Sequence, residues 1–454
     1  MTQADWERAA ALYLPISLSL IAGLLSRRHP RQFPASLLSL LWTLPSLLAL
    51  QVLNQHALWW TFAPGSEATL RTMPLEFYLG WAILWGILPS LALPNLNIPA
   101  TAAILVVADC LLMPLCRAGI HLNHNWLTGE ALAVATVLLP SLSIARWTRR
   151  KTHLALRATF QLAVAALLFL FLMPELVFAL RPGPGWSPLL NLPSLPRQLA
   201  LQIICLLALP AVAAVMEFAA RGNGTPIPYD PPTSLVSSGI YRFSANPIQI
   251  SCVLVLFAWA ALLRNPWLLI PPVVAIAYSA GLATWDESKD LDERFGAAWR
   301  AYRAEVHNWV PRWRPFHAGS PARLYIARTC GPCSQIRNWL EARHPVGLEI
   351  LDAESLPDHS IHRMRYETGG PQGDSATVDG VRAMAQALEH LNLPWALCGL
   401  TLRLPGVWQA IQLLTDASGL GPRSLCSYEE FPGNGVQSSM AGSSPAKAAA
   451  ETAR

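Results

Sequence analysis

Polar and aromatic side chains flank an apolar hairpin between Gly239 and Pro311. The first flank reads GIYRFSANPIQIS, and the second reads WDESKDLDERFGAAWRAYRAEVHNWVP. A Tyr-Arg pair and an Asn-Pro step precede the hairpin, whereas an acidic pair, a Phe-Gly step and aromatic residues at helical spacing follow it. A hairpin that only anchors the chain does not need two such flanks. We therefore expect a membrane enzyme that takes a polar cofactor from the aqueous side and a lipid-soluble substrate from the bilayer.

A second candidate for chemistry is the motif Cys330-Gly331-Pro332-Cys333. It follows the short apolar run RLYIA and precedes SQIRNWLEA, which has a helical pattern. Two thiols at this spacing can close a small disulfide, and the start of a helix favours the thiolate of the first one. We expect Cys330 to be the nucleophile and Cys333 the resolving thiol. Half of a zinc site is the disfavoured alternative, because zinc needs four ligands and Cys398 and Cys426 are isolated.

The composition places both motifs in a membrane protein. Of 454 residues, 53% are apolar and 13% are charged, about half the charged share of an average globular protein. Long apolar runs recur through the first 283 positions, so we predict a polytopic α-helical protein. The net charge of +5 lies mostly in a few loops and indicates membrane topology, with no nucleic-acid partner. The predicted spans are nine: 9–25, 33–53, 75–93, 98–116, 131–145, 158–180, 199–220, 248–263 and 267–283.

Basic residues in the loops predict the orientation of these spans. Ten Lys and Arg residues lie on the side that holds loops 26–32 and 146–157, against six on the other side. We therefore expect the N-terminus outside and the C-terminus in the cytoplasm, in the inner membrane of a bacterium. Asp109 and Glu175 within the spans are expected to be helix-end or paired structural carboxylates.

Shifts in composition divide the chain into four parts. Residues 1–216 form a transmembrane region without a motif that we can interpret, and 217–315 contain the hairpin and its flanks. A short linker over 312–320 leads to a small soluble α/β domain over 321–428. Residues 429–454 are small and polar, which predicts a disordered tail.

Residues 217–315 resemble the isoprenylcysteine carboxyl methyltransferase and phospholipid methyltransferase superfamily of integral-membrane enzymes. The resemblance rests on an ordered series of motifs: TPIPYDPP, GIYRF followed by Asn-Pro, an apolar hairpin, E-x-x-x-L-x-x-x-F-G-x-x-W-x-x-Y, and V-x-x-W-V-P-R. It implies that S-adenosyl-L-methionine (AdoMet) is held at the cytoplasmic face. It also implies that the substrate enters between helices from the bilayer.

AdoMet carries a methyl group that its sulfonium already activates, so the protein has to align the acceptor and exclude water. Glu287 can pair with the ammonium of the cofactor and Arg242 with its carboxylate. Tyr241, Trp299 and Tyr302 can form aromatic walls that attract the sulfonium by cation–π interaction.

By this resemblance, one set of residues belongs to the cofactor site: Tyr241, Asn246, Pro247, Glu287 and Tyr302. The resemblance also makes Arg242 and Arg300 catalytic or substrate-side groups. Asn246 stands where many relatives have histidine, and the acidic pair is either Asp286-Glu287 or Glu287-Ser288. These departures leave the methyl acceptor open.

Residues 321–428 resemble thioredoxin-like proteins, in which a strand, a CxxC motif and a helix follow one another. The segments ATVDGVRAMAQALEHL and LPWALCGLTLRLPGVWQAIQLL are similar to the DCC-type thiol–disulfide oxidoreductases. The resemblance implies that Cys330 and Cys333 form a redox-active pair. Ala327, Arg328 and Thr329 stand where that family places an acidic residue before its first cysteine.

Three functions follow from these features. The first is an AdoMet-dependent membrane methyltransferase that acts on a lipophilic or thiol/carboxylate acceptor, with a fused dithiol domain that keeps a thiol reduced by its high effective concentration. The second is a membrane-anchored thiol–disulfide oxidoreductase that uses Cys330 and Cys333 with a redox partner protein. The third is a transporter or scaffold without catalysis. No metal is expected in any of them.

Overall fold

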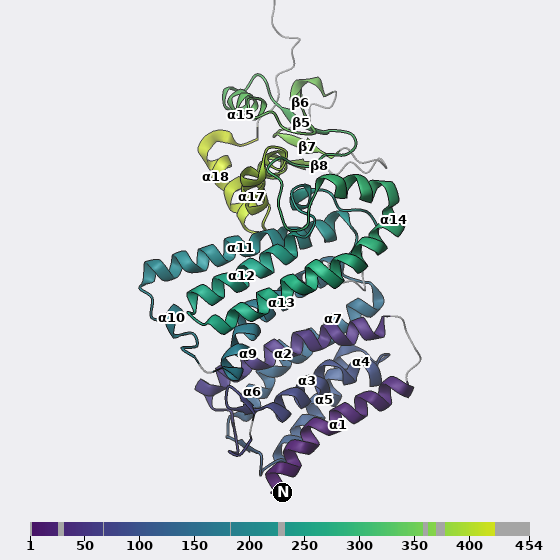
Figure 1. Cartoon of the computed structure of the whole chain (residues 1–454), viewed down its shortest axis with the longest axis vertical. Coiled ribbons are helices and arrows are strands. Elements are labelled where there is room, and N and C mark those ends of the chain that lie inside the picture. Colours follow the sequence, from purple (N-terminus) through teal and green to yellow (C-terminus); the bar gives the residue numbers. More distant parts are fainter. Residues whose placement is uncertain are drawn as a thin grey trace, which may run out of the picture.

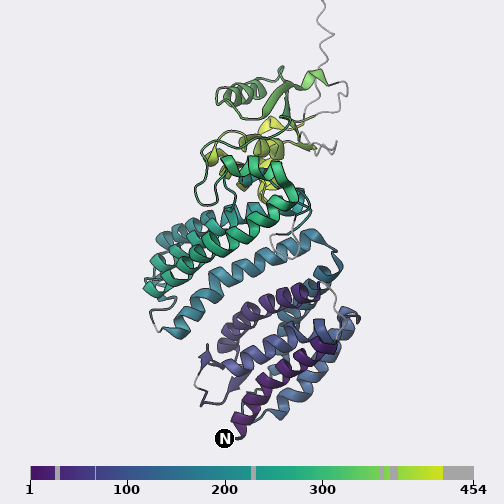
Figure 2. The same ribbon diagram turned by 45° about the vertical axis from the view of Figure 1, so that its right-hand side comes forward.

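The computed structural model describes residues 2–25, 31–66, 68–181, 183–225, 232–356, 362–368 and 377–422. The described chain is mostly helical and ends in a small sheet region. In Figures 1 and 2 the N-terminal helices occupy one end of the long axis, the sheet region occupies the other, and α11 to α13 lie between them. Cys426 and the predicted tail at 429–454 lie outside the described residues.

The N-terminal region contains helices joined by short connections and small β-ladders. The helices are α1 (Gln3–Leu25), α2 (Gln32–Ala57), α3 (Leu75–Gly86), α4 (Leu88–Ala92), α5 (Ile98–Leu112), α6 (Trp126–Ala133), α7 (Leu139–Arg150), α8 (Leu154–Leu167) and α9 (Met173–Leu180), with a 3₁₀ turn η1 (Met113–Leu115). The strands are β1 (Trp60–Phe62), β2 (Thr69–Leu70), β3 (Met73–Pro74) and β4 (Ile120–Leu122). β1 pairs with β4 and β2 with β3, both antiparallel.

Two of these helix pairs are continuous through a π-helical turn. η2 (Val134–Leu138) joins α6 to α7, and η3 (Leu168–Leu172) joins α8 to α9. Each π turn lies just before a proline, Pro140 or Pro174. A proline removes one backbone donor and its ring crowds the preceding turn, which a wider turn accommodates.

Seven described helices are long and apolar enough to cross a membrane. They are Gln3–Leu25, Gln32–Ala57, Leu75–Ala92, Ile98–Leu115, Trp126–Arg150, Leu154–Leu180 and Ser194–Arg221. Each overlaps one of the first seven spans that the sequence predicted. Two shorter apolar helices, Pro247–Leu262 and Pro266–Gly281, match the last two predicted spans.

Aromatic residues and paired carboxylates fill the core of the N-terminal region. The indole N–H of Trp85 donates to Asp109 Oδ2 at 2.7 Å. Glu175 accepts from Arg71 Nε at 2.8 Å and from Trp186 Nε1 at 2.6 Å. Both acids therefore have the structural partners that the sequence analysis expected.

The second part of the molecule contains the hairpin. Its elements are α10 (Ser187–Leu190), α11 (Ser194–Arg221), η4 (Gly239–Arg242), α12 (Pro247–Leu262), η5 (Pro266–Leu269), α13 (Ile270–Tyr278), the π turn η6 (Ser279–Ala283) and α14 (Thr284–Glu305). α11 packs along α12. The helical path runs without a break from Pro266 to Phe295, so α14 continues the second arm of the hairpin beyond its apolar part. Figure 1 shows α14 reaching the C-terminal domain.

The C-terminal domain has a four-stranded sheet in the order β6-β5-β7-β8. Its elements are β5 (Ala322–Ile326), α15 (Gly331–Glu341), β6 (Leu348–Asp352), η7 (Ala353–Ser355), β7 (Arg365–Glu367), β8 (Thr377–Asp379), α16 (Val381–Leu388), α17 (Leu393–Leu402), α18 (Val407–Thr415) and η8 (Asp416–Leu420). β5 pairs with β6 in parallel and with β7 antiparallel. Leu324 and Ile326 of β5 pack in the core with Leu340, Tyr366 and Ala383.

Candidate functional site

The two flanks of the hairpin fold together at one end of it. The hydroxyl of Tyr302 donates to the carbonyl of Tyr241 at 2.8 Å. The N–H of Ala245 donates to the carbonyl of His307 at 3.0 Å. The hydroxyl of Ser244 donates to the carbonyl of Asn308 at 3.2 Å. Segments 60 residues apart thus share one folded unit, which is the arrangement that a site built from both flanks requires.

Gly296 produces this arrangement, because it breaks α14. Its φ of 50° and ψ of −121° lie outside the conformations that side-chain-bearing residues adopt readily. After the break, Trp299 and Tyr302 turn inward, with their ring centroids 5.8 Å apart. Tyr302 also meets Phe316 edge-on at 5.4 Å. The Phe-Gly step of the sequence motif is therefore the point at which the chain folds back.

A cluster of polar side chains lies where the arms of the hairpin meet its flanks. Asn246 occupies the N-cap position of α12 without a capping bond from its side chain, and Pro247 is the first residue of the helix. Asn246 Nδ2 donates to Gln249 Oε1 at 3.0 Å, and the hydroxyl of Ser279 donates to the same oxygen. In the same region, Asn308 Nδ2 donates to Thr284 Oγ1 at 3.3 Å. The cluster puts amide and hydroxyl groups at the end of an otherwise apolar hairpin.

Glu287 lies on α14, one turn beyond Thr284, and its side chain reaches solvent. The surrounding protein partly desolvates its carboxylate, which raises the pKa of Glu287, while Arg303 opposes and Asp290 adds to the rise. Burial, with smaller contributions from Tyr302 and Glu287, also raises the pKa of Tyr241 well above its ordinary value. Burial is thus the main cause of both shifts, and Glu287 makes a smaller contribution to that of Tyr241.

Two of the predicted site residues point elsewhere. Arg242 is buried, and its guanidinium lies 3.4 Å from the Nδ1 atom of His390 in the C-terminal domain. Arg300 is exposed and pairs with Asp292 at 3.0 Å. The structure thus brings Tyr241, Asn246, Pro247, Glu287 and Tyr302 into one region but does not direct either arginine towards the polar cluster.

Buried ion pairs join α11 to the C-terminal domain, and we call this set the seam: Glu217, Arg221, Ser238, Arg242, Tyr366, Glu389, His390 and Arg403. Arg403 Nη1 lies 2.6 Å from Glu217 Oε1 and 2.5 Å from Glu389 Oε1. Burial alone would lower the pKa of Arg403, but the two carboxylates raise it. Arg403 is therefore the shared cation of two buried acids from different parts of the chain.

His390 occupies the centre of the seam in its neutral form. Its Nδ1 lies 2.7 Å from the carbonyl of Val346, which can only accept, so Nδ1 carries the proton. Its Nε2 then accepts from the hydroxyl of Tyr366 at 2.9 Å. Burial and the adjacent Arg242 guanidinium lower the pKa of His390 well below its ordinary value. Both ring nitrogens are thus committed to structural hydrogen bonds.

Apolar contacts complete the seam. Leu393, Leu397 and Leu400 of α17 pack against Ile240 and Tyr241 of the first flank. The N–H of Leu393 also donates to the carbonyl of Trp313 at 3.1 Å, within the segment that composition suggests as a linker. The linker is therefore fixed to both parts of the molecule, and the C-terminal domain is docked directly on the hairpin flanks.

Cys330 and Cys333 begin α15, as the sequence predicted. Cys330 is the N-cap residue and Pro332 lies in the first turn. Both thiols are half-buried and line a cavity of about 480 Å³. The N-terminus of a helix stabilises a nearby negative charge, so the arrangement suits a cysteine that reacts as a thiolate.

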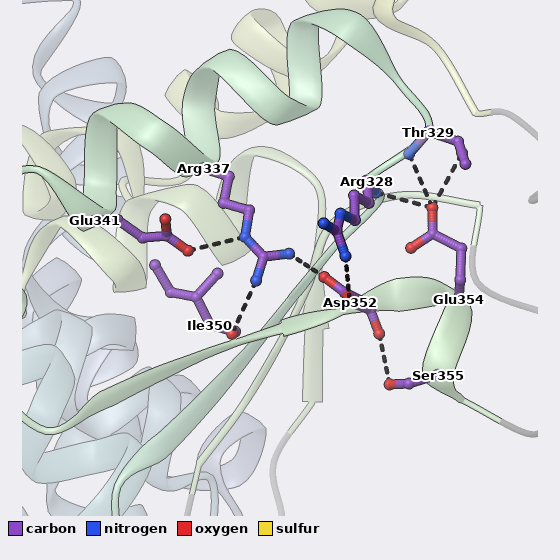
Figure 3. Close-up of polar contacts among 8 residues, drawn as sticks. All are labelled: Arg328, Thr329, Arg337, Glu341, Ile350, Asp352, Glu354 and Ser355. Carbon is purple, nitrogen blue, oxygen red and sulfur yellow. Dashed lines mark hydrogen bonds and ion pairs between the residues drawn. The ribbon is translucent and has the colours of Figure 1, made fainter.

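The loop before Cys330 is held by an acid from another element (Figure 3). Glu354 Oε1 accepts from the N–H groups of Arg328 at 2.8 Å and Thr329 at 3.1 Å. Burial would raise the pKa of Glu354, but hydrogen bonds from Thr329 and from backbone N–H groups outweigh it and lower the pKa. Arg337 of α15 pairs with Asp352 beside it. An acidic residue thus lies near the CxxC loop, although it does not precede the motif in sequence.

Several residues of these sites carried no sequence signal that we used. Gln249 is three residues after Asn246 on a helix, so helical spacing alone could have linked them. Arg403, Glu389 and His390 reach their partners only through the docking of two distant segments, which no local pattern encodes.

The chain matches no protein-family model, no curated protein and no solved structure. These comparisons therefore assign it to no family.

Proposed function

We propose that this protein is an integral-membrane, AdoMet-dependent methyltransferase that acts on a lipophilic acceptor. The observation that carries the proposal is the union of the two hairpin flanks, in which the hydroxyl of Tyr302 donates to the carbonyl of Tyr241. The resemblance to membrane methyltransferases requires both flanks to contribute to one cofactor site. Flanks that diverged from each other would have removed this basis.

The residues in this region suit most parts of the cofactor. Glu287 offers a solvent-accessible carboxylate for an ammonium group, and Asn246 and Gln249 offer amides for polar atoms. Tyr302 is aromatic but buried, and its hydroxyl is already bonded to the backbone, so it shapes the wall instead of binding directly. AdoMet would supply an activated methyl group. The chain would position the acceptor against that methyl and exclude water.

Arg242 does not suit the proposed pairing with the cofactor's carboxylate, because it faces His390 across the seam. We propose instead that Arg242 helps to position the first flank. Arg300 is exposed and paired with Asp292. It could contact only an acceptor that approaches along the outer surface of α14.

The acceptor is proposed to arrive from the bilayer along the hairpin. The second arm exposes Ile270, Val273, Val274 and Tyr278, an apolar surface that suits contact with lipid. We also propose that both arms cross the bilayer, which gives nine spans, and that the flanks and the C-terminal domain lie in the cytoplasm. Each arm has 16 residues, about 24 Å at 1.5 Å per residue, so the membrane would have to be thin there.

The test is AdoMet binding by the purified full chain, with Glu287→Gln and the matched variant Glu293→Gln on the exposed part of the same helix. A charge-assisted hydrogen bond contributes about 1.5–3 kcal/mol, so Glu287→Gln should weaken binding about tenfold or more. Glu293→Gln should bind as the wild type does. Equal affinity in both variants, or no binding by the wild type, would refute the proposed site.

A second function is favoured by a separate observation, the cavity beside Cys330 and Cys333. We propose that the C-terminal domain is a thioredoxin-like thiol–disulfide oxidoreductase, alone or with a redox partner protein. The strand order β6-β5-β7-β8 and the helix that starts at the CxxC motif support this fold. Cys330→Ser should abolish thiol–disulfide exchange and leave methyl transfer unchanged. Loss of both activities would show that they cannot be separated.

A further inference from the structure

The cavity beside the dithiol has a mostly apolar wall. Besides Cys330 and Cys333, it is lined by residues from β5, α15, α16, α17 and α18, among them Ile336, Met364, Met384 and Ile411. Its volume of about 480 Å³ is in the range of cavities that hold small organic molecules. The space is open on one side and lies next to two thiols, so a small molecule could enter it and reach them.

α18 forms one side of the cavity, and its side chains are not buried in the core of the domain. No residue of this helix is buried, although Ile411 and Gln412 line the cavity. Polar contacts hold it in place: Arg363 pairs with Asp416 at 2.6 Å, and the N–H of Val381 donates to Gln412 Oε1 at 2.9 Å. α18 therefore borders the cavity with Ile411, Gln412 and Thr415, of which Ile411 is the apolar contact.

The charges around the cavity indicate the polarity of its ligand. Arg363 lines the cavity, but its guanidinium is paired with Asp416. No aspartate or glutamate is among the described residues that line it. His362 is the other titratable side chain, besides the two thiols, among the described residues that line the cavity. Most of the wall is therefore apolar, and a charged ligand would lose its hydration against it. An uncharged apolar ligand would gain from burial.

We propose that this cavity binds a small, uncharged, apolar disulfide and presents its S–S bond to Cys330. The proposal rests on the thiol–disulfide function proposed above and adds its substrate class. The two cysteine thiols in the cavity wall are the reason for proposing a disulfide ligand. Two cysteines at this spacing can reduce a bound disulfide by thiol–disulfide exchange without any other reagent.

The reaction balances within the site. The Cys330 thiolate attacks one sulfur of the bound disulfide, which breaks the S–S bond, forms a mixed disulfide and releases one thiolate. The Cys333 thiolate then attacks Cys330, forms the Cys330–Cys333 bond and releases the second thiolate. The two protons of the cysteines pass to the two leaving thiolates. The ligand is reduced by two electrons to two thiols, and the protein dithiol is oxidised by two.

The test uses the pre-reduced full chain in single-turnover reactions with diphenyl disulfide and with 2-hydroxyethyl disulfide, which is small and polar. Ile411→Trp fills the cavity from α18, whereas Leu413→Trp is the matched change at an exposed position of the same helix. Ile411→Trp should raise the half-saturating concentration of diphenyl disulfide about tenfold and change that of 2-hydroxyethyl disulfide less than twofold. Leu413→Trp should change neither. Equal losses for both disulfides, or no loss, would overturn the proposal.

A binding measurement separates this proposal from the redox function itself. Full chain carrying Cys330→Ser and Cys333→Ser is titrated with fluorine-labelled 1,2-diphenylethane, a shape analogue that cannot be reduced, and the broadening of its ¹⁹F line is followed. Broadening that Ile411→Trp removes and Leu413→Trp keeps supports the cavity as an apolar binding site, even if the wild type reduces no disulfide. Absence of broadening contradicts the proposed ligand class, even if the thiols are redox-active.

Discussion

The seam and the dithiol cavity are two regions of the same C-terminal domain, and they use their side chains in opposite ways. At the seam, polar groups from both parts of the chain meet: Arg403 serves two carboxylates, and both nitrogens of His390 are bonded. At the cavity, apolar side chains surround a space of about 480 Å³, and the thiols border that space. Most polar groups of the first region find partners within the protein, although Arg242 Nε has none among the described residues. The second region instead borders an open space.

The difference separates motif residues that hold the fold together from motif residues that are placed to react. Tyr241, Arg242 and Tyr302 belong to a motif with a catalytic resemblance, yet their described contacts hold the flanks and the seam together. Cys330 and Cys333 border a cavity, and Cys333 also packs against the core of the domain. A single helix connects the two regions, because Leu402 of α17 lines the cavity and Arg403 follows it in the seam.

The largest expected effect comes from breaking the seam. Arg403→Ala leaves Glu389 buried without its cation and leaves Glu217 with Arg221 alone. Loss of one partner of a buried pair costs about 3–5 kcal/mol. Hydrogen exchange in α17 and in residues 239–243 should therefore become at least about 100-fold faster. Arg300→Ala, which removes an exposed pair, is the control and should cost at most about 1 kcal/mol. Similar exchange rates in the two variants would show that the seam does not hold the domain.

The next effect is a dependence on pH. The pKa of His390 is lowered in the folded state, so the unfolded chain binds a proton first as the pH falls. The stability of the domain should be constant above about pH 6.5 and should fall below it by up to about 1.4 kcal/mol per pH unit. Thermal unfolding at a series of pH values measures this slope. His390→Gln should flatten it between pH 6.5 and 5, and the exposed His307→Gln should not.

If the slope is the same in His390→Gln as in the wild type, other groups carry it. Glu354 is a separate contributor at lower pH, because its pKa is lowered in the folded state. Its share of stability is present above the unfolded value of about 4.3 and is lost as the pH falls through the folded value. The pH range of a loss in stability therefore shows whether it comes from His390 in the seam or from Glu354 at the loop that precedes the CxxC motif.

The smallest effect concerns the break in α14. Gly296→Ala should destabilise residues 297–305 by about 1–3 kcal/mol, because the left-handed backbone there strains any residue with a Cβ atom. An added Cβ would meet no atom within 4 Å at either Gly296 or Gly281. Gly281→Ala is thus a matched control that changes helix propensity only, and it should be neutral or slightly stabilising. Equal hydrogen exchange in both variants would mean that the break is not enforced by the glycine.

Seven of the nine predicted spans overlap described helices that are long and apolar enough to cross a membrane. Hydrophobic runs and prolines mark these positions directly, as in the helix that Asn97 caps at Ile98 and in α12, which begins at Pro247. The start of α15 at the CxxC motif followed from the same local logic. These features depend on neighbouring residues, which a sequence shows.

The direction of buried side chains was not predictable in this way. The sequence analysis expected Arg242 to pair with a cofactor carboxylate, but the docked domain offers His390 and its surroundings instead. Glu217 and Arg403 lie far apart in the chain, so their ion pair depends on how α17 packs against α11. The support of the CxxC loop by Glu354 likewise comes from a separate element and not from the residues before Cys330.

The most direct test of the proposed function is transfer of labelled methyl groups from AdoMet in membranes that contain the protein. We predict that the lipophilic fraction gains label with the wild type and with the Cys330→Ser, Cys333→Ser variant, and that Glu287→Gln reduces this label about tenfold or more. Label no higher than in membranes without the protein, or full labelling by Glu287→Gln, would contradict the account of a cofactor site between the two hairpin flanks.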